Sequence, residues 1–292
     1  MIIVVGAGPA GLAAAKSAAS KGCHVTVIDS QARGGGQYWR HQREVTGYKS
    51  NRSADYLNEL QQNKLITHIT GAQVWSAEKL GDGYQLNYLQ GGVEKKISAQ
   101  KIILTTGAYD RTLPFPGWTT SGVMTPGGAQ SLLKGHGVVA GKTIVVSGTG
   151  PFLLPVATAL AKNGARVEII EAQSPLRWAL SPLALLLNPG KFPELIHYVG
   201  AILRLKIKVS FGSAVTGYHN GEADISKVRS NLSIRKRNVR SATADVVATG
   251  WGFLPDVTLG GILGCAQTLD RDETVIFAVD REQRASAQNI WI

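Results

Sequence analysis

A glycine-rich loop with the spacing G-x-G-x-x-G stands near the N-terminus, and an acidic residue follows its last glycine eighteen positions later. In such a loop the first glycine allows a tight turn, the second lets the backbone approach a pyrophosphate, and the third lets the next helix pack close to the strand. The acid accepts hydrogen bonds from a ribose and disfavours a 2′-phosphate. The pattern predicts a site for an adenine dinucleotide that is formed by Gly6, Gly8, Pro9, Ala10, Gly11, Asp29 and Ser30.

The 26-residue unit that carries this loop occurs twice, with an offset of 142 residues and no gap. Residues 6–31 read GAGPAGLAAAKSAASKGCHVTVIDSQ, and residues 148–173 read GTGPFLLPVATALAKNGARVEIIEAQ. The second copy keeps the acid, but Leu153 replaces the third glycine, which we expect to push the helix away from the strand. Unless this copy is retained only for structure, it predicts a second site, for NAD or another adenine nucleotide, at Gly148, Gly150, Pro151 and Glu171.

Three consecutive glycines follow the first acid and precede Gln37. They allow the backbone to run against a flat ligand without side-chain clashes, which favours FAD over NAD at the first site. We expect the backbone of Gly35 and Gly36 to run along the ligand, and Gln37, Tyr38 and Trp39 to contact the flavin and its ribityl chain. The alternative is a flexible surface loop.

Two apolar segments that each end in Thr-Gly stand 143 residues apart, within residues 101–107 and 245–250. Their offset is almost that of the two glycine loops, so the duplication spans whole domains. The first of these segments adds Thr106 and Gly107 to the first site.

The elements that position these residues follow the same repeat. Residues 2–5 are apolar and β-branched, as in a parallel strand that is buried on both faces, and we expect a helix over 12–20 and a strand over 24–28. The second copy opens with a strand over 142–147. We therefore predict an α/β fold with two nested Rossmann-like dinucleotide-binding domains. Their expected extents are 1–115 for the first part of the FAD-binding domain, 116–252 for the second domain, and 253–292 for the return to the first.

The segments between these units also carry patterns. Alternating stretches within residues 71–98 predict a β-meander on the first domain. The proline-rich residues 113–118 predict a strand that crosses into the second domain. Residues 183–187 and 188–198 are typical of helical segments inserted after the second acid.

The composition is that of a globular protein with two domains. The chain has 292 residues, of which 44% are hydrophobic and 34 are glycine, and this excludes fibrous and disordered classes. Its longest apolar run is far shorter than the roughly 20 residues of a membrane span, and the chain enters a strand without a signal peptide, so we predict a cytoplasmic protein. The two cysteines, Cys23 and Cys265, form no CxxC pair, which excludes a mechanism of the thioredoxin reductase type.

The formal net charge of +11 comes in part from a cluster of cations in the second half of the chain. A basic surface can bind nucleic acid, anionic cofactors or an acidic partner. No nucleic-acid motif accompanies the cluster, so we expect a solvated or partner-facing surface and no nucleic acid. The cluster consists of Lys206, Lys208, Arg229, Arg235, Lys236, Arg237 and Arg240.

No grouping of side chains in the sequence indicates a nucleophile, a metal site or a pair of catalytic carboxylates. The six histidines are scattered without metal-ligand spacing, and we expect each to be an ordinary surface or loop residue. This fits chemistry that is carried by a flavin, which the protein binds and orients.

Together these features resemble one family. The sequence segments that carry the resemblance are GGGQ, TTGAYDRTLPFPGW (105–118), GVMTPGGAQSLLK (122–134), GTGPFLLPVA (148–157) and ATGWGFLPD (248–256). They are similar to the FAD-binding α subunits of heteromeric amino-acid oxidoreductases, namely those of opine oxidase, hydrogen cyanide synthase and the dye-linked proline or hydroxyproline dehydrogenases. The α chain of sarcosine oxidase contains the same module. More distantly, the nesting resembles thioredoxin reductase and other two-dinucleotide flavoproteins.

The resemblance implies an FAD-dependent oxidoreductase component. A second, flavin-containing catalytic subunit would oxidise an imino acid, an opine or a related small secondary amine or amino acid, and the electrons would pass through this chain. The resemblance also implies a strand after residue 280 that leads into an AGD or AGE motif, with an iron–sulfur region beyond it, so we expect a truncated or minimal form. Two alternatives are a stand-alone NAD(P)H-dependent flavoprotein reductase and a non-catalytic nucleotide-binding subunit or fragment.

Overall fold

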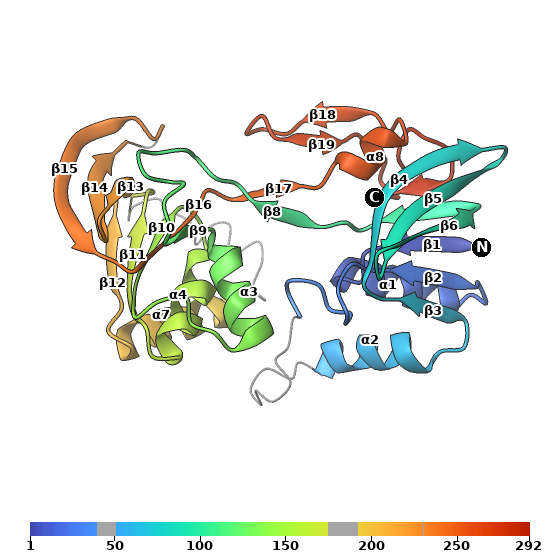
Figure 1. Cartoon of the computed structure of the whole chain (residues 1–292), viewed down its shortest axis with the longest axis horizontal. Coiled ribbons are helices and arrows are strands. Elements are labelled where there is room, and N and C mark those ends of the chain that lie inside the picture. The colour runs from blue at the N-terminus through green and yellow to red at the C-terminus, as the bar shows by residue number, and fades with distance from the viewer. Residues whose placement is uncertain (40–50, 175–191, 230) are drawn as a thin grey trace. The chain divides into compact units, whose positions relative to one another are not determined.

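The computed structural model describes residues 1–39, 51–174, 192–229 and 231–292 (Figure 1). The chain forms two compact units. Unit 1 consists of Met1–Tyr109 together with Leu254–Ile292, and unit 2 consists of Asp110–Phe253. From the sequence we expect the boundaries at residues 115 and 252.

Unit 1 is built around a five-stranded parallel sheet with the strand order β20-β7-β1-β2-β3 (Figure 1). The apolar runs in its central strands match a sheet that is covered on both faces. The strand order reverses at β1, and a doubly wound sheet binds its ligand at the carboxyl ends of the strands at such a reversal. The strands are β1 (Ile2–Val5), β2 (Val25–Ile28), β3 (Ile66–Ile69), β7 (Lys101–Leu104) and β20 (Ile290–Trp291).

Helices pack on one face of this sheet and an antiparallel meander packs on the other. Leu12 and Leu60 of the helices share a core with Val4, whereas Leu86 of the meander shares a second core with Ile3. The meander predicted within residues 71–98 is therefore confirmed. The covering elements are α1 (Pro9–Ala19), α2 (Asn51–Gln62), β4 (Ala72–Leu80), β5 (Gly83–Gln90), β6 (Val93–Ala99), α8 (Thr258–Ile262), β18 (Gln267–Leu269) and β19 (Val275–Phe277).

The chain passes between the units through two strands that pair with each other, β8 (Ala108–Asp110) and β17 (Phe253–Pro255). The crossing strand predicted over residues 113–118 is wrong, because those residues contain no strand. Pro114 and Pro116 have no N–H group to donate to a sheet, so the regular pairing lies before them.

Unit 2 repeats the plan of unit 1. Its parallel sheet has the order β12-β11-β10-β16-β9, so β10 takes the place of β1. On one face of this sheet, Leu160 of a covering helix shares a core with Ile144. On the other face, Ile225 of a three-stranded antiparallel sheet shares a core with Val145. The sheet strands are β9 (Val123–Met124), β10 (Thr143–Gly148), β11 (Arg166–Glu171), β12 (Lys208–Phe211) and β16 (Val246–Gly250).

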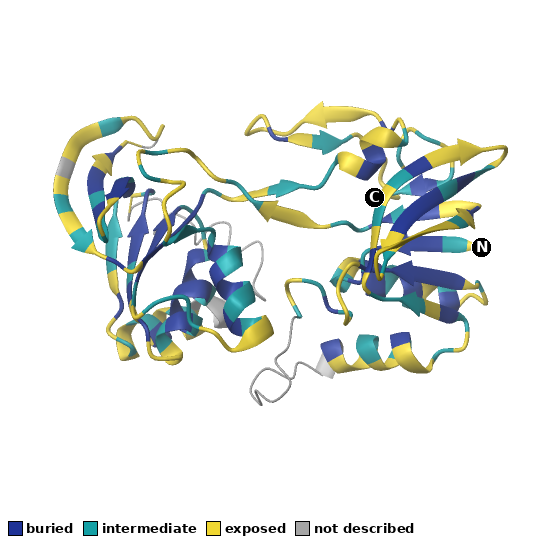
Figure 2. Cartoon of the chain, in the orientation of Figure 1, coloured by how far each residue is buried: buried dark blue, intermediate teal, exposed yellow. Residues whose placement is uncertain are grey.

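In the described part of unit 2, the covering layers are three helices and the sheet β13-β14-β15. Figure 2 shows that the central strands are mostly buried, whereas β15 is largely exposed along its length. Of the predicted helical segments, residues 183–187 and 188–191 lie outside the described residues, and the remainder belongs to α7. These elements are α3 (Pro126–His136), α4 (Leu153–Lys162), α7 (Phe192–Arg204), β13 (Ser213–His219), β14 (Glu222–Val228) and β15 (Ile234–Thr243).

The predicted α/β fold with two nested Rossmann-like domains is thus confirmed. Within the described ranges, no helix is both long enough and apolar enough to cross a membrane.

Candidate nucleotide-binding sites

The first glycine loop turns sharply because β1, α1 and β7 lie very close together. Gly6 has a φ of +104°, and a Cβ atom there would overlap the carbonyl oxygen of Thr105. A Cβ atom on Gly11 would overlap the carbonyl oxygen of Gly6. The Thr105 hydroxyl lies 2.9 Å from the carbonyl oxygens of both Val5 and Gly6, which ties the loop to the end of β7. Gly6 and Gly11 are therefore required for the shape of the loop itself.

Gly8 has no comparable packing role. It is the N-cap of α1 with φ −72° and ψ 179°, a conformation open to any residue, and a Cβ atom there would meet nothing within 4 Å. The N–H groups of Gly8, Ala10 and Gly11 donate to no acceptor in the described part of the chain, and Pro9 has no N–H group. Unpaired N–H groups at a helix N-terminus favour anions. The loop thus offers three N–H donors without an acceptor among the described residues, beside the open space at Gly8.

Asp29 stands at the end of β2 with only 7% of its surface exposed. Its Oδ2 accepts a hydrogen bond from the Ala7 N–H at 2.5 Å, and its Oδ1 accepts one from the Gln31 N–H at 2.6 Å. Each carboxylate oxygen has a second lone pair, so the group can still accept a hydroxyl from a ligand. Ser30, the next residue, is exposed. The predicted acid thus both orders the glycine loop and keeps acceptor capacity beside it.

His68 corrects the expectation that every histidine is an ordinary surface or loop residue. It lies within β3, and its Nε2 is buried without a hydrogen-bond partner among the described residues. Burial lowers the pKa of this imidazole, although the nearby Asp29 carboxylate raises it. The neutral form of the ring is therefore favoured, and its Nε2 is a buried polar atom that no described residue satisfies. No sequence signal pointed to this environment, because a single histidine in a strand has no distinctive spacing.

The triple-glycine loop packs directly against the first glycine loop. The Gly35 N–H donates to the Ala7 carbonyl oxygen at 2.7 Å. Gly36 has a φ of +56°, and a Cβ atom there would lie 2.9 Å from the Gly8 Cα. Gln37 follows with an exposed side chain. The structure therefore brings Gly35 and Gly36 together with the first glycine loop, as a shared ligand site would need.

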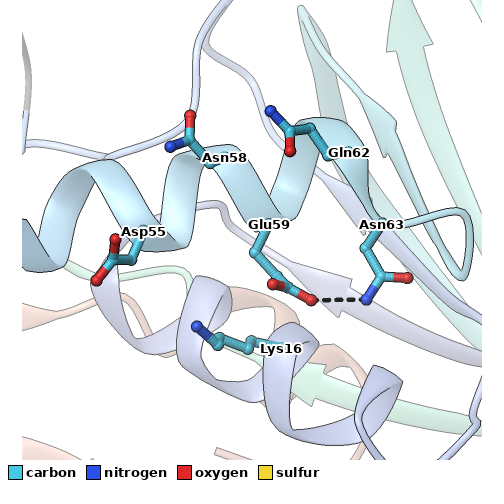
Figure 3. Close-up of a pocket in the computed structure, with 6 residues that line it drawn as sticks. All are labelled: Lys16, Asp55, Asn58, Glu59, Gln62 and Asn63. Atoms are coloured by element: carbon cyan, nitrogen blue, oxygen red, sulfur yellow. Dashed lines mark hydrogen bonds between the residues drawn. The ribbon is translucent and has the colours of Figure 1, made fainter.

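Contacts between aromatic and charged side chains pack the end of the triple-glycine loop against α1 and α2. Trp39 stacks on Tyr56 of α2 with 5.6 Å between ring centroids, and the Lys16 ammonium of α1 lies 5.2 Å from the Tyr56 centroid. Trp39 thus packs on α2 and Tyr38 is exposed, and the flavin contact expected for both residues stays a prediction. Figure 3 shows Lys16 pointing toward the side chains of α2 across a polar groove of about 400 Å³. The groove is lined by Lys16, Asp55, Asn58, Glu59, Gln62 and Asn63, and it contains none of the predicted site residues.

The end of β7 is joined to the returning segment of the chain. The Thr106 hydroxyl donates to the Asp256 carbonyl oxygen at 3.1 Å, and the Asp256 N–H donates to the Gly107 carbonyl oxygen at 2.9 Å. Gly107 has a φ of +81° and open space where a Cβ atom would stand. Thr106 and Gly107 thus lie at the carboxyl end of a strand next to β1. The sequence did not single out Thr105 or Asp256, which hold this edge in place.

The second copy reproduces the acid and one of its two backbone partners, because Gln173 corresponds to Gln31, whereas Gly150 corresponds to Gly8 and not to Ala7. Glu171 is 1% exposed, and it accepts hydrogen bonds from the N–H groups of Gly150 at 3.2 Å and Gln173 at 2.9 Å. Gly148 has a φ of +136°, and a Cβ atom there would overlap the Gly250 carbonyl oxygen, so the tight turn is also kept.

The first helical turn is where the copies differ. Helix α4 begins at Leu153, whereas the position equivalent to the start of α1 is Pro151. The Leu153 N–H donates to the Gly150 carbonyl oxygen at 3.3 Å, and the Leu154 N–H donates to Pro151 at 3.1 Å. Of the donors that correspond to the three free ones in unit 1, only the Phe152 N–H has no acceptor in the described ranges. The second loop therefore offers one donor to an anion where the first offers three.

Leu153 itself is 2% exposed and belongs to the core that α4 forms with its sheet. The sequence led us to expect a displaced helix; the structure shows a buried leucine and a rewound first turn.

A second difference is Trp251, directly after the second Thr-Gly segment, whose Nε1 is buried with no partner in the described part of the chain. Its ring packs beside Ala172 and Val228. The repeated Thr-Gly was the one signal in the sequence that could have pointed to it.

The pH dependence of stability tests the environment of Glu171. Burial raises the pKa of this carboxyl, although hydrogen bonds from Gln173 and Gly150 oppose the rise. The folded protein then binds the proton more tightly than the unfolded chain does. Relative to Glu171→Gln, the unaltered protein is expected to lose stability as the pH rises above 4.5, the ordinary pKa of the group, until the pH passes the raised folded-state value.

Urea unfolding of both proteins at pH values from about 4 to 8 measures this difference. A difference in unfolding free energy that stays constant with pH would show that the pKa of Glu171 is not raised by folding.

The whole chain, residues 1–292, matches the family of pyridine nucleotide-disulphide oxidoreductases. The chain belongs to this family. Members of the pyridine nucleotide-disulphide oxidoreductase family are FAD-dependent oxidoreductases, so the predicted enzyme class is confirmed.

Named relatives within this family agree with the predicted resemblance. The chain is 30% identical over 315 residues to an opine oxidase subunit of Rhizobium meliloti, covering 100% of this chain and 57% of the relative. It is 28% identical over 305 residues to the hydrogen cyanide synthase subunit HcnB of Pseudomonas protegens, covering 99% of this chain and 64% of the relative. The chain therefore spans about three fifths of the length of these relatives.

Among solved structures, thioredoxin reductase of T. acidophilum superposes with a TM-score of 0.69 at 20% identity, covering 99% of this chain and 88% of that one. At this identity the likeness concerns the fold, and it agrees with the two nested units of this pyridine nucleotide-disulphide oxidoreductase.

Proposed function

We propose that unit 1 binds FAD and that the chain is the electron-transferring component of a heteromeric amine or amino-acid oxidoreductase. The observation that carries the first part is the loop at Gly8, where three N–H groups have no acceptor in the described part of the chain and lie beside a buried acid. When bound, FAD supplies the chemistry, because its isoalloxazine ring accepts a hydride or electrons.

The residues of unit 1 fit such a dinucleotide in distinct ways. The N–H groups of Gly8, Ala10 and Gly11 would hold the pyrophosphate, with the α1 dipole favouring its negative charge. Asp29 would accept a ribose hydroxyl with the acceptor capacity that its backbone partners leave. Gly35 and Gly36 would keep the following loop close to Gly8, because a Cβ atom on either would meet the backbone of Trp39 or Gly8.

At the second site we propose a weaker interaction with an adenine nucleotide. Glu171 keeps the position of the ribose acid, but the loop offers a pyrophosphate only the Phe152 N–H group. This argues against a stand-alone NAD(P)H-dependent reductase, which would need a strong second site.

The proposal for the partner and the substrate is based on the named relatives. Both named relatives are described as subunits, one of opine oxidase and one of hydrogen cyanide synthase. We propose that a second, flavin-containing subunit binds and oxidises the small amine or amino acid, since no side-chain grouping in the sequence of this chain indicates a substrate-oxidising centre. The cytoplasmic location inferred from the sequence stays a prediction.

An absorption spectrum of the purified chain tests the proposal first. We expect flavin bands, with about one FAD per chain released on denaturation and identified by its mass. Reduction of a dye by NADH should be slow without a partner subunit, since the second loop has lost two of its three donors. A colourless protein that takes up no added FAD would favour the non-catalytic alternative, and rapid NADH-driven reduction would favour the stand-alone reductase.

A further inference from the structure

The positive charge of this protein is concentrated in unit 2. Sixteen of the 31 lysines and arginines but only seven of the 20 aspartates and glutamates lie between residues 110 and 253, so unit 2 has a formal charge of +9 of the total +11. Five exposed cations gather at the β14–β15 hairpin, which forms one edge of the three-stranded sheet. We call them the β15 basic surface: Lys227, Arg229, Arg235, Lys236 and Arg237.

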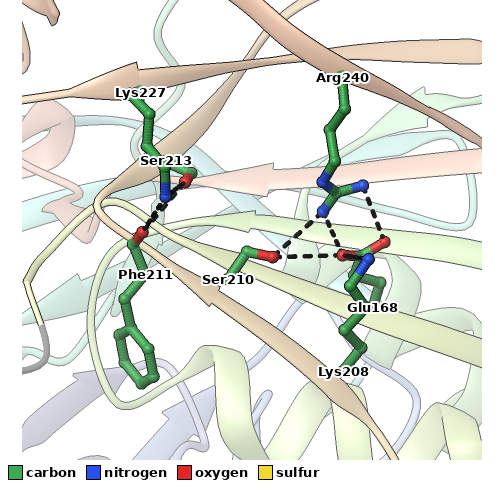
Figure 4. A network of polar contacts seen from close by, with 7 residues as sticks. All are labelled: Glu168, Lys208, Ser210, Phe211, Ser213, Lys227 and Arg240. Atoms are coloured by element: carbon green, nitrogen blue, oxygen red, sulfur yellow. Dashed lines mark hydrogen bonds and ion pairs between the residues drawn. The ribbon is translucent and has the colours of Figure 1, made fainter.

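Most of these cations have no internal partner. The side chains of Arg229, Arg235, Lys236 and Arg237 make no hydrogen bond or ion pair with any residue that the structure describes. Lys227 alone is engaged, since its ammonium donates to the Phe211 carbonyl oxygen and to Ser213, both at 3.0 Å (Figure 4).

The sheet places like charges directly opposite each other. Lys227 and Lys236 are cross-strand partners, an arrangement that destabilises an isolated pair of strands. The carboxylates of the same sheet lie toward its other end, where Glu222 accepts from Thr243 at 2.7 Å and Asp224 accepts from Ser241 at 3.2 Å. The repulsion is therefore not relieved within the sheet, and an external negative group would relieve it.

A polar network fixes β15 to the body of unit 2. Arg240 donates to the Glu168 carboxylate of β11 and to the Ser210 hydroxyl of β12 at 3.1 Å, and the Lys208 ammonium lies 3.3 Å from the same carboxylate (Figure 4). The cations at Arg235 to Arg237 are thus held on an anchored strand. A preorganised surface loses less conformational entropy when a partner binds.

The neighbouring residues favour a protein over a nucleic acid. Leu232 and Val239 lie among the cations with 40% and 36% of their surface exposed, and residues 227–240 contain no aromatic residue. Single-stranded nucleic acids need aromatic platforms for their bases, whereas protein interfaces combine arginine with apolar side chains. Exposed lysine and arginine also discourage the addition of another strand to a sheet edge, so contacts would form through side chains.

We propose that the β15 basic surface docks a protein partner that presents a cluster of carboxylates, and that this partner is the second subunit. The identity of the partner rests on the proposed function; the acidic chemistry of the docking face rests only on unit 2.

Binding of poly-L-glutamate, followed by fluorescence anisotropy at low salt, tests the chemistry of this surface. The variant R235E/K236E/R237E should bind at least about tenfold more weakly than the unaltered protein, with a shallower salt dependence. The matched control K79E/K95E/K96E changes the net charge equally at three exposed lysines of the unit 1 meander, and it should weaken binding by less than about twofold. Circular dichroism and FAD content should be unchanged in both variants.

Equal losses in the two variants would overturn the proposal, as would no binding of poly-L-glutamate by the unaltered protein. Tighter binding of poly(U) RNA of matched charge, or of vesicles containing anionic lipid, through the same three residues would overturn it in favour of those ligands. Each result is independent of FAD content, so the docking surface and the flavin site can fail separately.

Discussion

Gly8→Val is expected to abolish FAD binding while leaving the free energy of unfolding of the apoprotein almost unchanged. The backbone of Gly8 has ordinary angles, and a Cβ atom there meets no protein atom within 4 Å, so the fold can accept the valine. The added methyl groups would occupy the space that the pyrophosphate needs and would cover the donors at the start of α1. FAD per chain should fall from about one to below about a tenth, measured by absorbance after gel filtration.

Two other glycines make this experiment specific. Gly200→Val is the matched control, because Gly200 is an exposed position of α7 with open space around it, and it should keep its FAD. Gly11→Val should instead fail to fold properly, since its Cβ atom would overlap the Gly6 carbonyl oxygen. If Gly8→Val retained FAD at full stoichiometry, the assignment of the first site would be wrong.

Asp29→Ala is expected to weaken FAD binding and to destabilise unit 1 at the same time. The loss of a hydrogen bond between the ribose and a charged acceptor should cost about 1–3 kcal/mol of binding free energy, which is roughly a 5- to 150-fold loss of affinity. The N–H groups of Ala7 and Gln31 would also lose their acceptor, so the apoprotein should unfold at a lower urea concentration.

Asp29→Glu separates these effects, because the glutamate of the second copy holds the N–H group of Gln173, which corresponds to Gln31. It should recover part of the stability of the apoprotein. Glu171→Ala serves as the control in unit 2 and should leave FAD affinity unchanged. If the FAD affinity of Asp29→Ala equalled that of the unaltered protein, Asp29 would not be the ribose acid.

The duplicated pattern allowed much of this architecture to be predicted. The strand at residues 2–5, the glycine loop and the acid at Asp29 occur where expected, because local propensity, burial on both faces and the backbone demands of glycine all favour one arrangement. The short strand β9 could not be predicted, whereas a strand after residue 280, where β20 lies, was implied only by the family resemblance. Each has two residues, and each is a strand only because a neighbouring strand supplies its partners.

The finer features of the two sites depend on distances that a sequence does not contain. The replacement of a glycine by Leu153 was visible, but the number of free donors in the rewound turn depends on how the helix accommodates that side chain in the core. The unpaired Nε2 of His68 likewise results from neighbours that are brought together by the sheet. The crossing strand was misplaced because proline in this region marks the end of regular pairing.

The position of β20 has a consequence for how the chain acquires its structure during synthesis. Unit 2 is contiguous, so all of its residues are available once Phe253 has been made. The sheet of unit 1 is completed later, because β20 pairs with β7. The Tyr84 hydroxyl of the meander also donates to the carbonyl oxygen of Gln288, 204 residues away. Contacts between such distant residues form slowly, since a long loop must be closed first. Unit 2, which contains the second glycine loop, is therefore expected to fold before unit 1, which contains the first. FAD would bind only when β20 joins the sheet of unit 1.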